Sequence, residues 1–209
     1  MRTATRTLLV AALAAFAAGV KAQDAAPTLQ EDPRAAKFKD VERGFFVGFE
    51  LGALGFTKTT AQDPNRYPYA ADGGGASGGL LVGVNVGVDL GSHFALSAFF
   101  MGGNERASVN YGAFSVYALG LDGRFSFYSL RDRNGYERFY VYAHARSGVA
   151  RSYPAGLFGD REVYFAIGPG IEYFTHLRHF SIGMAADLAY AAKAKAPGYA
   201  VYPTVRYTF

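Results

Sequence analysis

The feature that most constrains this fold is a period-two alternation that begins at Gly44 and continues to the last residue. One parity is apolar and the other carries glycine, polar and charged side chains, because successive residues of a β-strand point to opposite faces. Eight stretches show the alternation: 45–53, 80–90, 94–100, 117–127, 139–146, 163–173, 180–190 and 201–209. In all eight, the apolar parity contains no Asp, Glu, Lys, Arg or His. The sequence therefore predicts an all-β fold of eight strands with one uncharged face.

The uncharged face indicates whether the predicted strands belong to a soluble sheet or to a membrane barrel. A soluble sheet turns its apolar face inward and its charged face to solvent, whereas a membrane barrel turns the apolar face to lipid and the charged face to its interior. A single Arg or Lys facing the bilayer midplane costs about 2–4 kcal/mol. Strands cross lipid only in a closed barrel, where every backbone group is paired. We therefore expect an eight-stranded antiparallel transmembrane β-barrel over residues 44–209.

The first 22 residues are typical of a secretory signal peptide. Arg2 and Arg6 form a basic start, residues 8–20 form an apolar stretch too short to span a bilayer, and small residues precede a cleavage site after Ala22. Residues 23–43 are polar and charged, and we interpret them as a periplasmic lead-in. The chain thus divides into a signal peptide, a lead-in and a barrel.

Charge and cysteine content exclude several classes of function. Three of the 21 basic residues lie in the signal peptide, which leaves 18 against 17 acidic residues, without the clustered basic face that nucleic-acid binding requires. The absence of cysteine excludes disulfides, thiolate metal sites and a cysteine nucleophile. No cofactor and no metal site is expected.

The connections between the eight stretches predict the orientation of the barrel. Short turns at 91–92, 131–135 and 176–179 alternate with connections at 56–79, 103–107, 152–161 and 191–198. Outer-membrane barrels have short periplasmic turns and longer extracellular loops. Both termini are therefore expected in the periplasm of a Gram-negative bacterium.

The chain ends in Val-Arg-Tyr-Thr-Phe, with aromatic Tyr207 and terminal Phe209 at alternate positions. This ending resembles the assembly signal of bacterial outer-membrane barrels, although Thr204 stands where that pattern often has glycine. Over residues 44–209 the chain resembles the small OmpA-type, OmpX-type and opacity-protein barrels. The resemblance implies two partners, the barrel-assembly machinery and outer-membrane lipid or lipopolysaccharide. A weaker resemblance, carried by residues 37–56, is to barrels of the myxobacterial adventurous gliding-motility apparatus.

The charged parity supplies the candidate interior residues. Eight strands enclose a lumen just wide enough to be filled by side chains, so we expect these residues to pair into a network that plugs it. The expected network contains Glu50, Asp89, Asp122, Arg124, Arg138, His144, Arg146, Glu172, Asp187 and Arg206. A narrow porin-like channel would require an unplugged interior.

An enzyme that modifies lipid A would require a serine within reach of a histidine base. His144 and Ser147 are the nearest candidates, but three residues apart in a strand they point to opposite faces. No catalytic residue is expected. The connection 56–79 is the longest and combines aromatic and charged side chains, which suits partner binding; its candidate contacts are Arg66, Tyr67, Tyr69 and Asp72.

The expected function is therefore a non-enzymatic structural or surface-binding barrel that contacts partners through its outer loops. The alternatives are a subunit of a multi-protein envelope machine such as a gliding-motility apparatus, whose partners would be other envelope proteins, a narrow channel, and a lipid-A-modifying enzyme.

Overall fold

The structure, a computed structural model, describes residues 41–57, 78–106, 113–133, 135–153, 161–177 and 179–209. The predicted signal peptide, nearly all of the lead-in, and Arg66, Tyr67, Tyr69 and Asp72 lie outside these residues. Within them, no helix is long and apolar enough to cross a bilayer.

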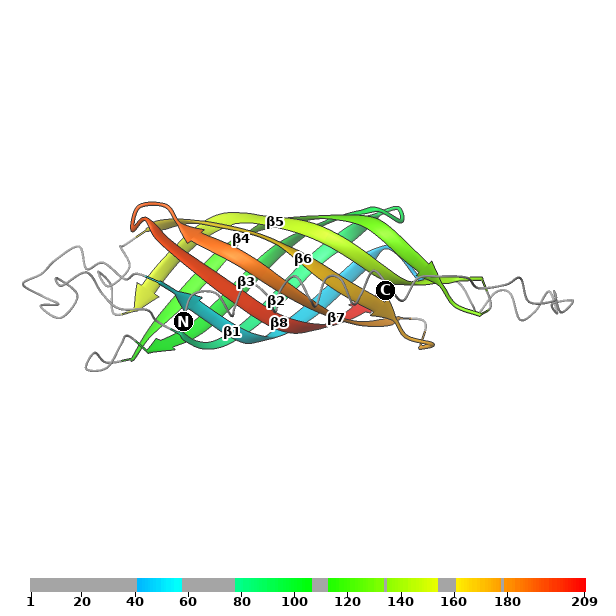
Figure 1. Cartoon of the computed structure of the whole chain (residues 1–209), viewed down its shortest axis with the longest axis horizontal. Coiled ribbons are helices and arrows are strands. Elements are labelled where there is room, and N and C mark those ends of the chain that lie inside the picture. The colour runs from blue at the N-terminus through cyan, green and yellow to red at the C-terminus, as the bar shows by residue number, and fades with distance from the viewer. Residues whose placement is uncertain (1–40, 58–77, 107–112, 134, 154–160, 178) are drawn as a thin grey trace, which may run out of the picture. The chain divides into compact units, whose positions relative to one another are not determined.

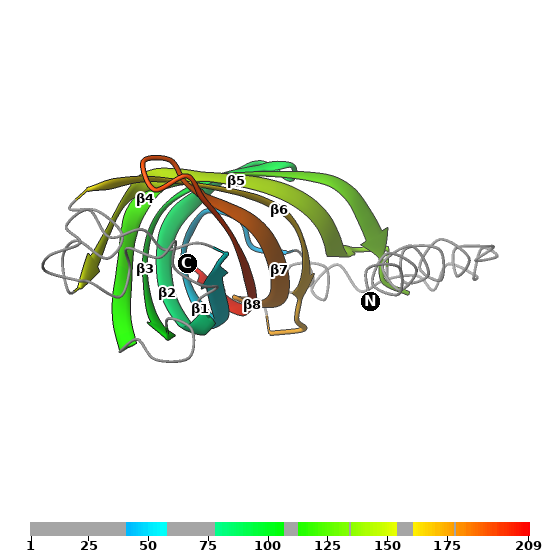
Figure 2. The same cartoon turned by 60° about the vertical axis from the view of Figure 1, so that its left-hand side comes forward.

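Eight antiparallel strands form a closed barrel in sequence order, which confirms the predicted fold class (Figures 1 and 2). The strands are β1 (Phe45–Phe56), β2 (Gly78–Leu90), β3 (Phe94–Arg106), β4 (Ala113–Arg131), β5 (Glu137–Tyr153), β6 (Glu162–Phe174), β7 (Phe180–Ala191) and β8 (Ala196–Thr208).

Pairing of the first and last strands closes the barrel. Phe46 lies opposite Thr208, and the backbone N–H of Phe209 donates to the carbonyl of Phe45 at 2.8 Å. Closure leaves no strand edge with unpaired backbone groups, which is the condition for strands to survive in hydrocarbon.

The barrel has two distinct ends, which we name by what they carry. The terminal end holds the start of β1, the end of β8 and the connections 91–93, 132–136 and 175–179. The loop end holds the connections 57–77, 107–112, 154–161 and 192–195. Apart from the connection 192–195, which is as short as those at the terminal end, the alternation of short and longer connections agrees with the prediction. Two of the predicted connections are misplaced.

The predicted connection 191–198 is wrong in extent, because β8 begins at Ala196 and the turn occupies only residues 192–195. Pro197 favoured a loop at the start of this strand, since proline cannot donate to a ladder. Pro203 lies inside the predicted strand, and the β1–β8 register skips there from Glu50↔Thr204 to Ala53↔Val201. The link predicted near 103–107 is also displaced, to 107–112, because β3 continues through Gly102 and Gly103.

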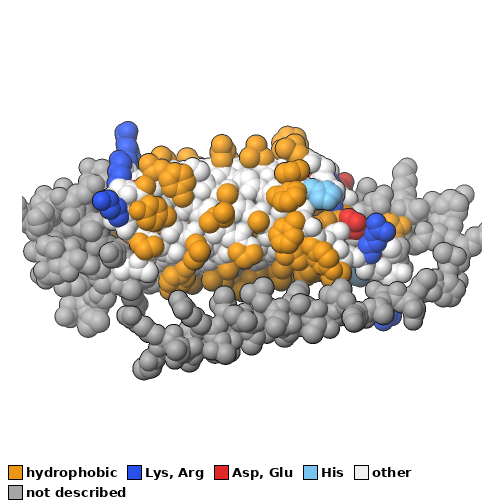
Figure 3. Space-filling model, turned by 45° about the horizontal axis from the view of Figure 1, so that its top comes forward, with side chains coloured by type: hydrophobic (Ala, Val, Ile, Leu, Met, Phe, Trp, Pro, Cys, Tyr) orange, Lys and Arg blue, Asp and Glu red, His pale blue; other side chains and the backbone are white. Residues whose placement is uncertain are grey.

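A band of exposed apolar side chains, contributed by all eight strands, surrounds the barrel. Leu121, Ile167 and Leu188 expose 60%, 61% and 72% of their surface, which would be a large apolar patch in water and is expected in lipid. Aromatic side chains border this band, including Phe45, Phe94, Phe125, Phe180 and Phe209 at the terminal end and Tyr117, Tyr153, Phe165, Tyr190 and Tyr199 toward the loop end. Figure 3 shows the hydrophobic side chains between charged ones at either end.

The apolar band predicts a position-dependent cost for an outward charge. We expect Val86→Arg, at an outward position 52% exposed in the middle of β2, to destabilise the folded barrel by about 2–4 kcal/mol. The measurement is urea unfolding in phosphatidylcholine vesicles. The control is Leu177→Arg, which places the same side chain in the turn 175–179 at a residue 68% exposed. Equal losses for the two variants would contradict the assignment of the band to lipid.

Candidate functional site in the barrel lumen

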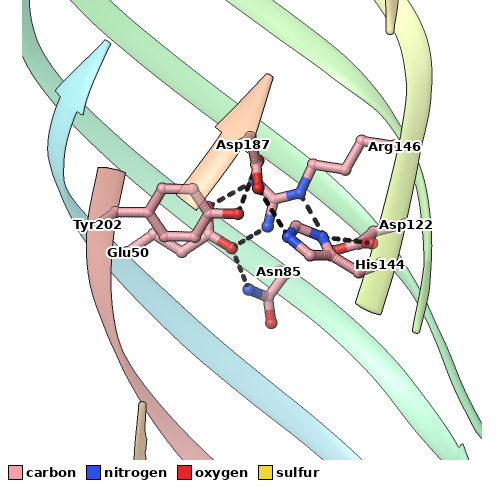
Figure 4. Close-up of polar contacts among 7 residues, drawn as sticks. All are labelled: Glu50, Asn85, Asp122, His144, Arg146, Asp187 and Tyr202. Atoms are coloured by element: carbon pink, nitrogen blue, oxygen red, sulfur yellow. Dashed lines mark hydrogen bonds and ion pairs between the residues drawn. The ribbon is translucent and has the colours of Figure 1, made fainter. Parts of the chain in front are cut away.

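A central cluster of seven side chains from β1, β2, β4, β5, β7 and β8 lies inside the barrel (Figure 4). Arg146 donates from both terminal nitrogens to the two carboxylate oxygens of Glu50, one of them at 2.9 Å, and its Nε donates to Asp122 Oδ2 at 3.1 Å. The Asn85 amide donates to Glu50 Oε1 at 2.8 Å. A bidentate guanidinium–carboxylate pair of this kind fixes orientation as well as charge.

His144 extends the central cluster toward β7. Its Nδ1 lies 3.2 Å from Asp122 Oδ1 and its Nε2 lies 2.7 Å from Asp187 Oδ1, while the Tyr202 hydroxyl donates to Asp187 Oδ2 at 3.0 Å. Both ring nitrogens of His144 therefore face carboxylate oxygens, so neither is available to activate a nucleophile.

A second, terminal cluster lies nearer the terminal end. Arg124 pairs with Glu172, Arg206 Nη2 donates to Asp89 at 2.5 Å, and Arg206 Nε lies 3.6 Å from Glu172. The Ser181 hydroxyl donates to Glu172 Oε1 at 2.6 Å, on the same oxygen that Arg206 Nε approaches, while Arg124 pairs with Oε2. Two arginines therefore balance two carboxylates, as a buried ionic group requires.

Aromatic rings support each lumen arginine. Arg146 lies between Phe99 and Tyr202, with its guanidinium carbon 5.2 and 4.9 Å from the ring centres. Arg206 lies 4.1 Å from the Phe46 ring centre and 5.5 Å from that of Phe174; Arg124 lies 4.2 Å from that of Tyr142. A desolvated cation over an aromatic face gains about 2 kcal/mol, which offsets part of its burial.

The two clusters border one small polar cavity of about 50 Å³. This volume holds roughly three or four water molecules, enough to hydrate the charged groups but not to form a continuous pore.

An apolar tier fills the lumen on the loop-end side of these clusters. Its members are fully buried and come from all eight strands; the largest are Leu54, Phe56, Leu81, Phe99, Met101, Phe114, Val116, Tyr164 and Tyr202, with alanines between them. Beyond this tier, the buried Glu162 carboxylate accepts N–H bonds from Lys193 at 2.5 Å and Ala194 at 2.9 Å and so anchors the turn 192–195. The described lumen is thus polar toward the terminal end and apolar toward the loop end.

Residues of the terminal rim hold the chain that precedes β1. Arg43 donates to the Gly91 carbonyl at 3.2 Å and to the Tyr140 hydroxyl, and the Glu42 carboxylate lies 2.7 Å from His179 Nδ1. The predicted lumen residue Arg138 also belongs to this rim, where it donates to Asp132 at 2.8 Å and to the Thr175 carbonyl at 3.0 Å.

The structure places nine of the ten predicted lumen residues in the two clusters and Arg138 at the rim. Sequence reasoning missed Asn85, Tyr202 and Tyr142, although all three lie on the predicted inward parity. It also missed the apolar tier. The available signal was apolar residues on both parities near the loop end, as in Leu80-Leu81 and Phe99-Phe100-Met101.

The residues considered for catalysis are separated by the barrel wall. His144 is buried in the lumen, whereas Ser147 is exposed on the outer surface, as the spacing predicted. At the C-terminus, Tyr207 packs edge-on against Phe180 and Phe209, with ring centres 5.0 Å apart in each pair. The predicted assembly signal therefore lies on the outer surface, where β8 closes onto β1.

Known solved structures share this fold. Neisserial surface protein A (NspA) is 14% identical with a TM-score of 0.58, over 79% of this chain and 97% of that one. The outer membrane protein OprG from Pseudomonas aeruginosa is 9% identical with a TM-score of 0.52, over 82% of this chain and 99% of that one. No protein-family model matches the sequence, and no curated protein matches it. The predicted resemblance to small outer-membrane barrels is thus confirmed at the level of fold, while the motility resemblance has no support.

The central cluster predicts a large loss of stability when its cation is removed. Arg146→Met leaves Glu50 and Asp122 buried without their partner, so we expect a loss of about 3–5 kcal/mol in unfolding free energy. The double variant Glu50→Gln/Arg146→Met should recover part of it. Arg131→Met is the control, because the Arg131–Glu137 pair is exposed and worth at most about 1 kcal/mol. Similar losses for Arg146→Met and Arg131→Met would refute a buried network.

Inward glycines predict a second, steric sensitivity. A Cβ on the inward Gly170 would stand 2.2 Å from the ring of Tyr142, whereas one on Gly123, which lies on the outer face of β4, would meet nothing within 4 Å. We expect Gly170→Ala to lower the yield of folded barrel and Gly123→Ala to leave it unchanged, because the buried Tyr142 ring would have to move away from Arg124, which lies 4.2 Å from its centre. Heat-modified electrophoretic mobility after refolding measures the folded fraction. Unaltered folding of Gly170→Ala would show that the lumen tolerates rearrangement.

Proposed function

We propose that this chain is a non-enzymatic integral outer-membrane protein of a Gram-negative envelope, a filled barrel that anchors surface connections which bind a partner. The observation that carries the proposal is the combination of a lipid-type outer band with a lumen filled by ion pairs and an apolar tier. A filled lumen favours function at the surface, since it provides no wide path for solutes.

The orientation follows from the same reasoning. The loop end faces outward and the terminal end faces the periplasm, because short connections and both barrel termini gather at one end. This orientation puts the connection 57–77 on the cell surface. Its residues Arg66, Tyr67, Tyr69 and Asp72 are the proposed partner contacts, since aromatic side chains among charges are typical of binding hot spots.

The barrel-assembly machinery is the proposed partner during biogenesis. The outward aromatic residues Tyr207 and Phe209, at the seam between β8 and β1, would be its recognition element. No cofactor or metal is proposed.

Site-specific crosslinking on intact cells tests the surface contacts. A photoreactive tyrosine analogue at position 67 or 69 should crosslink a partner, whereas the same analogue at Tyr111, in the separate outer connection 107–112, should not. A surface or extracellular partner supports the proposal. Capture of a periplasmic or inner-membrane protein instead would favour a subunit of an envelope machine, and absence of any crosslink would contradict the loop assignment.

Two further measurements separate the remaining alternatives. The purified barrel should show no steady unitary conductance in planar bilayers, because the apolar tier blocks the loop-end side of the lumen. Expression should leave the mass of lipid A unchanged. Steady conductance would establish a channel, and altered lipid A would establish an enzyme.

A further inference from the structure

A groove of about 580 Å³ lies on the outer surface of the barrel, where lipid is expected. Two cross-strand rows form it, each running from β4 through β5 and β6 to β7. The rows are Leu121–Ser147–Phe165–Tyr190 and Gly123–Ala145–Ile167–Leu188. The side chains from β4 and β5 include the small Gly123, Ala145 and Ser147, whereas those from β6 and β7 are large. The groove therefore forms because the outward residues on β5 are small and lie beside the large apolar side chains of β6 and β7.

Four basic residues follow the groove toward the loop end. Arg151 extends outward from β5, Arg161 immediately precedes β6, and Lys193 and Lys195 belong to the turn between β7 and β8. All four are exposed. The Ala150↔Glu162 pair and the bond from Ala192 N–H to the Val163 carbonyl place these segments side by side. The cations thus form one basic cluster beside the groove.

Among the described residues, none of the four cations of the basic cluster forms an ion pair with a carboxylate. The neighbouring Glu162 is fully buried and accepts backbone N–H bonds from Val163, Lys193 and Ala194. On the face drawn in Figure 3, the charged side chains visible at the left-hand end are basic, whereas basic, acidic and histidine side chains are visible together at the right-hand end.

The spacing between groove and cluster suits one kind of molecule. Arg151 follows Ser147 by four residues on the same strand, so the cation lies about 13 Å along the strand from the groove. A ligand that fits both features has an anionic headgroup and an acyl chain attached to it. Arginine and lysine both bind phosphate, arginine through two parallel hydrogen bonds.

We propose that this surface binds lipid A, with a phosphate at Arg151, Arg161 and Lys193 and an acyl chain in the groove over Ala145 and Ser147. Lipid A is the phosphorylated, acylated lipid of the outer leaflet that this end of the barrel would meet. The inference rests on the proposed orientation in the membrane but not on the partner contacts of the connection 57–77.

Native mass spectrometry of the full mature chain in detergent micelles tests the proposal. With bis-phosphorylated lipid A added, the wild-type barrel should retain a lipid A molecule. Arg161→Ala/Lys193→Ala should weaken that binding about 25-fold, because each of the two cations near an anionic surface strengthens binding about fivefold. The matched control is Arg133→Ala, which removes an exposed cation from the turn 132–136 at the opposite end.

The groove has its own pair of variants. Ala145→Phe fills the groove with an apolar side chain that lipid tolerates, and should lower lipid A retention severalfold without reducing folding. Ala53→Phe makes the same change at an exposed outward position on β1, away from the groove, and should have no effect. Heat-modified mobility confirms that each variant is folded.

Three outcomes would overturn the proposal: equal retention of dephosphorylated lipid A, equal retention of phosphatidylglycerol, or equal losses in the variants and their controls. The first would remove phosphate recognition, the second would replace lipid A by any anionic lipid, and the third would leave only nonspecific contact. Partner crosslinking at positions 67 and 69 is independent of all three, so failure here is distinguishable from failure of the proposed function.

Discussion

Closure of the backbone ladder by β1 and β8 is the constraint on which the rest of the structure depends. The backbone N–H of Phe209 donates to the Phe45 carbonyl, so no strand edge remains unpaired and the strands can lie in hydrocarbon. The pleat of the strands then fixes where each side chain points. One parity faces lipid and must be uncharged, and the other faces a narrow lumen. Because lipid cannot neutralise a charge, the lumen must neutralise its own charges, and Arg146, Arg124 and Arg206 do so through direct carboxylate partners.

The polarity of the lumen changes along its axis, and this asymmetry has a physical reason. The ion pairs and the small polar cavity lie toward the terminal end, where water can reach them and lower the cost of burying charge. The apolar tier around Phe99, Met101 and Phe114 lies toward the loop end and excludes water there. Among the described residues, apolar packing therefore fills one half of the lumen, while the charged half supplies directional bonds between distant strands.

The sequence predicts which face of the barrel wall each side chain occupies far better than which side chains contact one another. Parity alone identified Glu50 and Arg146 as interior residues, but their contact joins positions 96 residues apart and depends on the stagger of the strands, which alternation does not encode. Local chemistry caused the other errors. Pro197 suggested a loop at the start of β8, and Gly102-Gly103 suggested a turn inside β3. The apolar tier was readable in Phe99-Phe100-Met101, where the inward parity is apolar as well.

Strand β5 carries both candidate sites on its two faces. Its inward side chains, Tyr142, His144 and Arg146, are large and polar, whereas the outward Ala143, Ala145 and Ser147 are small. The ion pairs of the lumen and the groove on the lipid face are therefore separated by one thickness of backbone. Because adjacent residues point to opposite faces, a change at Arg146 acts on stability and a change at Ala145 acts on the outer surface. A chain whose interior is filled can thus vary its outer face without disturbing the packing that holds the barrel closed.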